Sequence, residues 1–224
     1  MRDVLKIWND WCAAHSIAQD GVPLFQTNHG EIVATKQIGR SPRPVLLRDP
    51  DMEALVIQEA NTLVTDWERG EHLYDGLIYM MFTLKEQHVL PLYIGKAESI
   101  GKGDKNLSVN IKSLARDKSK FARWGDNYAY HIGDLSAAAL TGHPPEKVNP
   151  KYTRWAAALF ETVEDGNVRL HQRTYFWVKA WRSTDVGIWT EMRPMRLSFL
   201  EYLLIGVASS AFGTNVLNYE GRNR

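Results

Sequence analysis

Four side chains of chemically useful types occupy informative places in the sequence. Tyr79 and Tyr93 each lie in an apolar run, and Lys96 follows the second of them. Glu201 lies alone inside the apolar segment SFLEYLLIG. A buried carboxylate is costly unless it is paired or binds a metal, so Glu201 favours metal or proton chemistry. Glu201 is explained equally well if it lies on the solvent-exposed edge of its helix or forms an ion pair with an arginine.

The predicted elements place these residues on a sheet and on one late helix. Apolar runs at 72–84 and 90–97, joined by the short polar segment KEQH, predict an antiparallel hairpin. A β-rich stretch at 168–181 is a third strand, and 31–38 is a short one. Apolar residues at helical spacing predict helices at 3–18, 50–69, 106–125, 152–165 and 192–212. This order predicts an α+β fold with a small, mostly antiparallel three-stranded sheet flanked by helices.

Length and composition set the class of protein. The chain has 224 residues, enough for one domain with extensions, and we divide it into an N-terminal helical extension at 1–70 and a main domain at 71–224 with an insertion around 97–165. Its net charge of +1 gives no support to nucleic-acid binding, although a local basic patch decides that question.

A single cysteine, Cys12, allows no disulfide within the chain, so a reducing cytoplasm is the expected location. The N-terminus lacks an apolar signal segment, and no run of 18 apolar residues occurs, so we expect no membrane span.

The two tyrosine segments and the late glutamate together resemble the GIY-YIG nuclease family. That family carries its two tripeptides on neighbouring strands, and here they are "LIY" at 77–79 and "YIG" at 93–95. Leucine replaces the first glycine, although Gly76 lies one residue earlier. The third strand RTYFWVKAW and the helix LSFLEYLLIGVASSAFGTN follow in the family's order, with Glu201 as its glutamate and Asn215 as its asparagine. The resemblance covers residues 74 to about 218.

The family's helix arginine has no direct counterpart, because Asn110 stands at its position. Two later arginines can supply the charge that contacts the scissile phosphate. Arg123, in KFARWG, is preferred to Arg116, in ARDKSK, because its Trp-Gly neighbours suggest a packed helix end. His131 is a further candidate for substrate binding. The long segment between the second strand and these residues resembles the loops of GIY-YIG restriction endonucleases.

The resemblance implies a metal-dependent endonuclease that hydrolyses double-stranded DNA, of type II restriction style, acting as a homodimer on palindromic sites. Glu201 would hold one Mg²⁺ or Mn²⁺ ion, which suits hard oxygen ligands. Tyr79 is the first choice for the base, with Tyr93 positioning water or phosphate, and these roles are exchangeable. A nearby cation would lower the high pKa of a tyrosine, and Lys96 supplies it if the chain turns after Gly95.

Two other hypotheses remain open on the sequence. Asn110 and the altered first tripeptide are compatible with a catalytically inactive nucleic-acid-binding module on the same fold. A structural protein whose YIG tripeptide is accidental is the third. Cleavage of DNA in magnesium, compared with binding alone, separates the three.

Overall fold

The computed structural model describes residues 3–101, 106–116 and 132–222. Its main sheet contains the strands β1 (Val22–Pro23), β8 (Thr174–Arg182), β4 (Tyr74–Lys85) and β5 (His88–Glu98), in that order and antiparallel throughout. The predicted α+β fold is confirmed, but the sheet has four strands and not three. The fourth, β1, is too short to leave a hydrophobic pattern, and it comes from the N-terminal extension.

The predicted hairpin forms as β4 and β5, joined by Glu86 and Gln87. Both loop residues have positive φ, 49° and 72°, which is the backbone of a tight two-residue turn. Strand β4 pairs with β5 on one side and β8 on the other, so it is the central strand with hydrogen bonds on both edges. Eight consecutive residues of β4, 76–83, are buried, which explains why this strand reads as a continuous apolar run.

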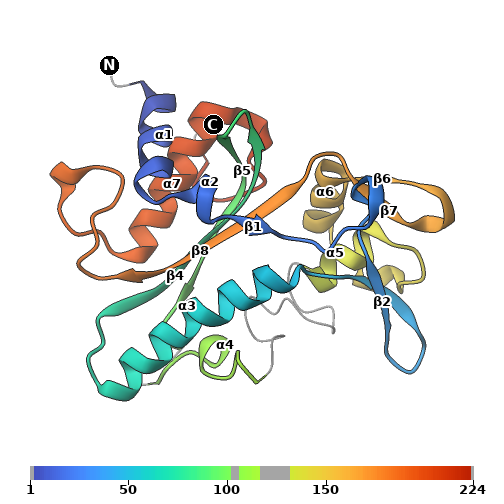
Figure 1. Cartoon of the computed structure of the whole chain (residues 1–224), viewed down its shortest axis with the longest axis horizontal. Coiled ribbons are helices and arrows are strands. Elements are labelled where there is room, and N and C mark those ends of the chain that lie inside the picture. The colour runs from blue at the N-terminus through green and yellow to red at the C-terminus, as the bar shows by residue number, and fades with distance from the viewer. Residues whose placement is uncertain (1–2, 102–105, 117–131, 223–224) are drawn as a thin grey trace.

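Helices cover both faces of the sheet (Figure 1). Side chains alternate across β4, so Leu77, Tyr79 and Met81 share a core with α3 (Pro50–Arg69), α5 (Ile132–Ala139) and α6 (Pro150–Leu159). Ile78, Met80 and Phe82 face the other way. They pack with α1 (Val4–Ala14), α2 (Ile17–Asp20) and α7 (Leu197–Phe212).

The N-terminal 70 residues contribute to both cores. On α1, Trp8 is fully buried against α7 and donates its indole N–H to the Val89 carbonyl at 2.9 Å. Helix α3 matches its predicted bounds, because Asp49 caps its first turn and Gly70 ends it in a left-handed conformation. The extension is therefore built into the same cores as the later part of the chain.

Smaller elements lie on the α3 side. Strands β2 (Thr35–Ile38) and β3 (Arg43–Leu46) form a separate hairpin, and β6 (Phe160–Thr162) pairs with β7 (Val168–Leu170). The predicted third strand at 168–181 is thus divided between β7 and β8. Short 3-10 turns lie at His29–Glu31, Pro145–Lys147, Glu164–Gly166, Thr190–Met192 and Gly213–Asn215.

The prediction of one long basic helix needs correction. The long basic helix expected at 106–125 begins as α4, but α4 spans only Val109–Lys112, because Ser113 leaves the helical conformation. Residues 113–116 form turns, and the remainder lies outside the described residues. The segment Leu197–Asn215 is long and apolar enough to cross a membrane, by length and composition alone. In this structure Leu200, Leu204 and Ala208 of that segment are buried in the core.

Candidate functional site

The two tyrosines of the tripeptides lie side by side on the α3 face of the sheet. Tyr79 pairs across the strands with Gly95, and Tyr93 pairs with Met81, two positions along. The two ring centroids are 6.3 Å apart, and the side chains are hydrogen-bonded to each other. The hairpin register therefore brings together two hydroxyl groups that the sequence separates by 14 residues.

Gly95 is needed because the Tyr79 ring lies directly over it. A Cβ at position 95 would come within 2.5 Å of Cζ and 2.6 Å of the Tyr79 hydroxyl oxygen, closer than real atoms approach. The chain does not turn after Gly95, since β5 continues in register to Glu98. The expectation that glycine lets the chain bend was therefore wrong, and the space for the Tyr79 ring explains the residue.

Lys96 accordingly stays on the opposite face of β5 from Tyr93. Its ammonium group forms a close ion pair with Glu98 and donates to the Ser198 hydroxyl at 2.6 Å. Ser198 also donates to Glu98 at 2.9 Å. Lys96 is thus part of a polar cluster that joins β5 to the first turn of α7.

Helix α7 brings Glu201 to the edge strand β5. The first turn of this helix receives no cap from its own N-cap residue, Arg196. Asp75, at the start of β4, caps the helix instead. Its carboxylate accepts hydrogen bonds from the Leu197 N–H at 3.1 Å and from Arg196 Nε at 2.7 Å. Asp75 therefore fixes the start of the helix that carries Glu201.

Glu201 and Tyr93 line one cavity of about 400 Å³ between α7, β5 and α6. Its lining comes from the end of the chain as well as from these elements. The lining residues are Tyr93, Lys151, Glu201, Tyr202, Ile205, Asn218, Tyr219 and Glu220. The sequence analysis selected Tyr93 and Glu201 of this set and missed the others.

The cavity favours proton-bearing groups at neutral pH. Burial raises the pKa of Glu201 to about 7, and the nearby carboxylates of Glu98 and Glu220 act in the same direction, while the charge of Lys96 opposes them. Burial also raises the pKa of the Tyr93 hydroxyl, and the charge of Glu201 adds to this effect. The expectation that a nearby cation lowers the tyrosine pKa is therefore wrong for Tyr93, which remains protonated at neutral pH.

Lys151 supplies a positive charge inside this cavity. It lies in the first turn of α6, which Asn149 caps through the Lys151 N–H at 2.9 Å. Its ammonium nitrogen is 5.4 Å from the centroid of the Tyr93 ring and 5.2 Å from that of Trp155. Cation–π contacts of this kind attract a lysine ammonium group to the faces of aromatic rings. The sequence signal was slight: a lysine after Asn-Pro at a helix start.

Asn218, and not Asn215, connects the chain end to the YIG strand. The Asn218 side chain accepts from the Ile94 N–H at 3.0 Å and donates to the Ile94 carbonyl at 2.7 Å. Asn218 is buried, whereas Asn215 is exposed at the end of a 3-10 turn. No local pattern separates these two asparagines, because the contact spans 124 residues.

The expected arginines lie elsewhere or outside the described residues. Asn110 belongs to α4, which packs against α3. Arg116 is exposed after this helix and does not line the cavity. Arg123 and His131 fall outside the described residues. Arg154 on α6 lies near the cavity: it donates to the Leu217 carbonyl, and its guanidinium carbon is 4.7 Å from the centroid of the Tyr219 ring.

The donor set of the cavity fits a single hard cation held by few protein ligands. Within the described part of the chain, no group of three or more His, Cys, Asp or Glu side chains is placed to hold a metal ion. Glu201 and Glu220 nevertheless line the same cavity. Magnesium keeps several waters and needs only one or two carboxylates plus substrate phosphate.

Comparison with protein-family models, with curated proteins and with solved structures finds no match to this chain.

Proposed function

We propose that this chain is a metal-dependent endonuclease that hydrolyses phosphodiester bonds in DNA, of the restriction type. The observation that carries the proposal is the convergence of Tyr93, Lys151 and Glu201 on one cavity from β5, α6 and α7. The resemblance to the GIY-YIG nucleases requires a strand tyrosine and a helix glutamate at one site. The register of β4 and β5 adds Tyr79 beside Tyr93.

In this proposal Glu201 is the carboxylate that binds Mg²⁺ or Mn²⁺, with Glu220 at the same cavity wall. A bound divalent ion would stabilise negative charge on the leaving oxygen. Deprotonation of Glu201, whose pKa is raised to about 7, must precede metal binding. The backbone N–H of Lys96 donates to the Glu201 carboxylate, and the charge of Lys96 favours its ionised form.

In this proposal Lys151 contacts the scissile phosphate, the role that the sequence analysis assigned to an arginine. Lys151 lines the cavity that contains Glu201, and its ammonium group would contact a non-bridging oxygen of the scissile phosphate. A fixed positive charge in a site of this kind stabilises charge that develops in the transition state. Lysine acts there as a point charge and lacks the bidentate geometry of arginine.

The two tyrosines differ in what they can do. Because Tyr93 stays protonated, it donates a hydrogen bond, either to the attacking water or to the phosphate. Tyr79, hydrogen-bonded to Tyr93, remains the candidate base, and it would accept the proton of the water only as its phenolate. Water then bonds to phosphorus, the bond from phosphorus to the leaving oxygen breaks, and the leaving oxygen takes up a proton from solvent, to which Tyr79 returns the proton that it removed.

A cleavage assay tests the function. Purified protein is incubated with plasmid and phage DNA in magnesium, manganese or chelator. We expect metal-dependent, discrete fragments, and a smear would instead indicate a nuclease of low specificity. Binding without cleavage in any divalent metal would support the inactive nucleic-acid-binding module. Absence of both binding and cleavage would refute a nuclease.

Matched variants test the site. Glu201→Gln and Lys151→Met should each lower the cleavage rate by about 100-fold or more, the usual effect of removing a group that stabilises the transition state. Glu146→Gln and Lys85→Met change the same charges at exposed positions and should cleave like the wild type. Cleavage by Glu201→Gln at the wild-type rate would show that the assigned cavity is wrong.

A further inference from the structure

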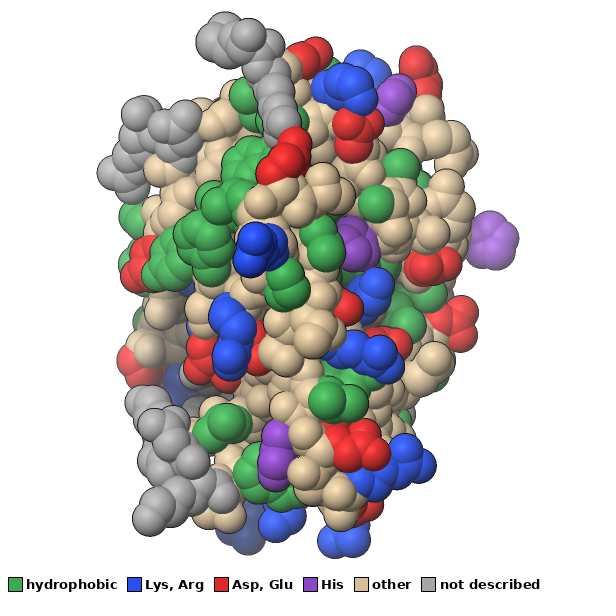
Figure 2. Space-filling model, turned by 90° about the vertical axis from the view of Figure 1, so that its left-hand side faces the viewer, with side chains coloured by type: hydrophobic (Ala, Val, Ile, Leu, Met, Phe, Trp, Pro, Cys, Tyr) green, Lys and Arg blue, Asp and Glu red, His purple; other side chains and the backbone are tan. Residues whose placement is uncertain are grey.

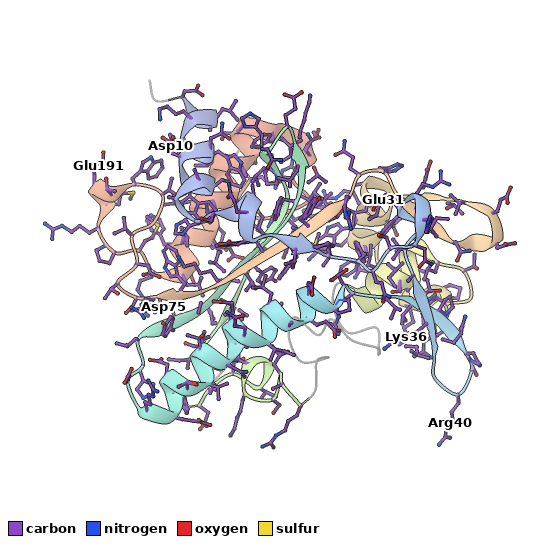
Figure 3. The ribbon with its side chains drawn as sticks, in the orientation of Figure 1. Asp10, Glu31, Lys36, Arg40, Asp75 and Glu191 are labelled. Carbon is purple, nitrogen blue, oxygen red and sulfur yellow. The ribbon has the colours of Figure 1, made fainter. Side chains whose placement is uncertain are left out.

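The β2–β3 hairpin projects from the body of the protein as a narrow two-stranded arm (Figure 1). Its pairing runs from Thr35 with Leu46 to Ile38 with Arg43, and residues 39–42 form the loop at its tip. Gly39 takes a positive φ of 83° there. Lys36 and Arg40 are exposed, and Figure 3 shows Arg40 at the extreme end of the arm.

The charge of this arm has one sign. Between Glu31 and Asp49 the sequence has four charged residues, and all of them are basic. They are Lys36, Arg40 and Arg43 on the arm itself, and Arg48 beyond it, which is paired with Glu53 at 2.8 Å. The chain as a whole has a net charge of only +1, so this concentration is local. The end of the molecule that Figure 2 faces shows acidic and basic side chains interspersed. A projecting basic element is suited to a polyanion.

The base of the arm is held firmly while its tip is exposed. Val45 and Leu46 are buried, and the Leu46 N–H donates to the Ser136 hydroxyl at 3.0 Å. The His143 ring nitrogen Nε2 and the Pro44 carbonyl oxygen are 2.7 Å apart. An anchored arm is preorganised, so little ordering entropy is lost when its tip binds a partner.

The arm also lies within reach of the candidate nuclease cavity. His143 contacts the arm at Pro44, and Lys151 of the cavity follows eight residues later in the chain. Eight residues span at most about 29 Å even when fully extended. One turn of B-DNA is about 34 Å long. A duplex with its scissile phosphate beside Lys151 and its axis directed toward His143 would therefore reach the base of the arm within roughly one helical turn.

From this arrangement we infer that the β2–β3 arm binds duplex DNA beside the cleavage site, with the ribbon in the major groove and Lys36 and Arg40 on phosphates. The inference rests on the proposed nuclease function. The major groove of undistorted B-DNA is wide enough for a two-stranded β-ribbon, whereas the minor groove is about half as wide and must be opened to take one. Phosphate contacts from the arm would set the position of the duplex, and its polar tip would face base edges.

Salt-dependent binding tests the inference. The affinity of wild type and of Lys36→Ala/Arg40→Ala for a fluorescein-labelled duplex is measured by anisotropy in chelator across a salt series. Each phosphate contact contributes about 0.9 to the slope of log affinity against log salt, so the arm variant should lose about 2 from this slope. If the affinities of the two proteins converge near 1 M salt, that of the variant at 0.1 M salt should be roughly 60-fold lower. The control Arg69→Ala/Lys85→Ala removes the same charge from exposed positions elsewhere and should retain the wild-type slope.

A tethered cleavage reagent locates the arm on the DNA. Cys12 is buried, so Arg40→Cys places an accessible thiol at the tip for attachment of an iron chelate. Strand scission should occur within about 10 base pairs of the cut that the wild type makes on the same duplex. Circular dichroism of each variant confirms that the fold is retained.

The outcomes separate the two proposals. A wild type that neither binds nor cuts DNA refutes the nuclease function itself. A wild type that cuts, with an arm variant indistinguishable from the control in slope and affinity, overturns the inference about the arm. Equal losses of affinity for the duplex and for a polyglutamate peptide would also overturn it, because the arm would then be a general site for acidic ligands.

Discussion

The aromatic ring of Tyr79 on β4 occupies the space above Gly95 on β5 that a side chain at position 95 would fill. The two residues are direct partners across the strands, and the ring also lies 5.8 Å from that of Phe176 on β8. This contact fixes the Tyr79 hydroxyl beside that of Tyr93. The glycine of the YIG tripeptide is therefore a packing requirement of the tyrosine in the other tripeptide.

Gly95→Ala should lower the free energy of unfolding by about 1–3 kcal/mol, the usual cost of forcing an extra carbon into a packed core. The Tyr79 ring must move, so cleavage should fall by more than the loss of folded protein explains. Urea denaturation and the cleavage rate per folded molecule measure the two effects. Gly101→Ala is the control, because its nearest neighbour would be 3.6 Å from the new carbon. If Gly95→Ala and Gly101→Ala were equally stable, the close contact between Gly95 and the Tyr79 ring would be contradicted.

Stability without metal should fall as the pH rises from about 4.5 to above 7, because the folded protein holds the Glu201 proton more tightly than the unfolded chain does. The stability due to neutral Glu201 is complete below pH 4.5 and is lost as the pH passes the folded pKa of about 7. After screening by solvent this amounts to roughly 1–2 kcal/mol. Unfolding in chelator, compared between wild type and Glu201→Gln from pH 4.5 to 8, measures it. A constant difference across this range would contradict the raised pKa.

Metal affinity should rise over the same pH interval in which the apoprotein loses stability. The metal competes with a proton for Glu201, so the apparent magnesium affinity should increase close to tenfold per pH unit below about pH 7 and level off above it. Calorimetric titration of magnesium at pH 6, 7 and 8 gives this dependence. Affinity that does not change with pH would exclude Glu201 as the ligand.

Asn218→Ala should destabilise the protein by about 2–4 kcal/mol. The change leaves both the N–H and the carbonyl of Ile94 without their partner in a buried place, at about 1–3 kcal/mol for each group. Asn215→Ala, at an exposed position three residues earlier, should stay within about 0.5 kcal/mol of wild type. Thermal and urea unfolding of the pair measure the difference. If Asn215→Ala were the less stable of the two variants, Asn215 and not Asn218 would be the asparagine that stabilises the fold.

Asp75→Ala should cost about 1 kcal/mol of stability through loss of the α7 cap, and it should also weaken magnesium-dependent cleavage because α7 carries Glu201. Asp75→Asn keeps an acceptor for the Leu197 N–H and should recover part of both losses. Asp10→Ala removes a surface carboxylate that pairs with Lys6 at 2.7 Å and should have a small effect. Cleavage by Asp75→Ala at the wild-type rate would show that the cap does not position Glu201.

The sequence by itself determined the local elements of this protein. Helix α3 begins and ends at its predicted residues because Asp49 and Gly70 are local signals that act on the adjacent backbone. The β4–β5 hairpin was predicted for the same reason, since apolar runs and a short polar turn are properties of neighbouring residues. The α+β class followed from the order of these elements.

The tertiary structure decided which distant residues meet. Lys151 reaches Tyr93 because α5 and α6 pack on one face of the sheet, and Asn218 reaches Ile94 because the chain end returns along β5. Strand β1 has two residues, too few for a pattern, and exists because the edge of β8 is open to it. Periodicity identifies an element and its buried face. The partners across a cavity depend on how whole faces pack, and no local sequence signal contains that information.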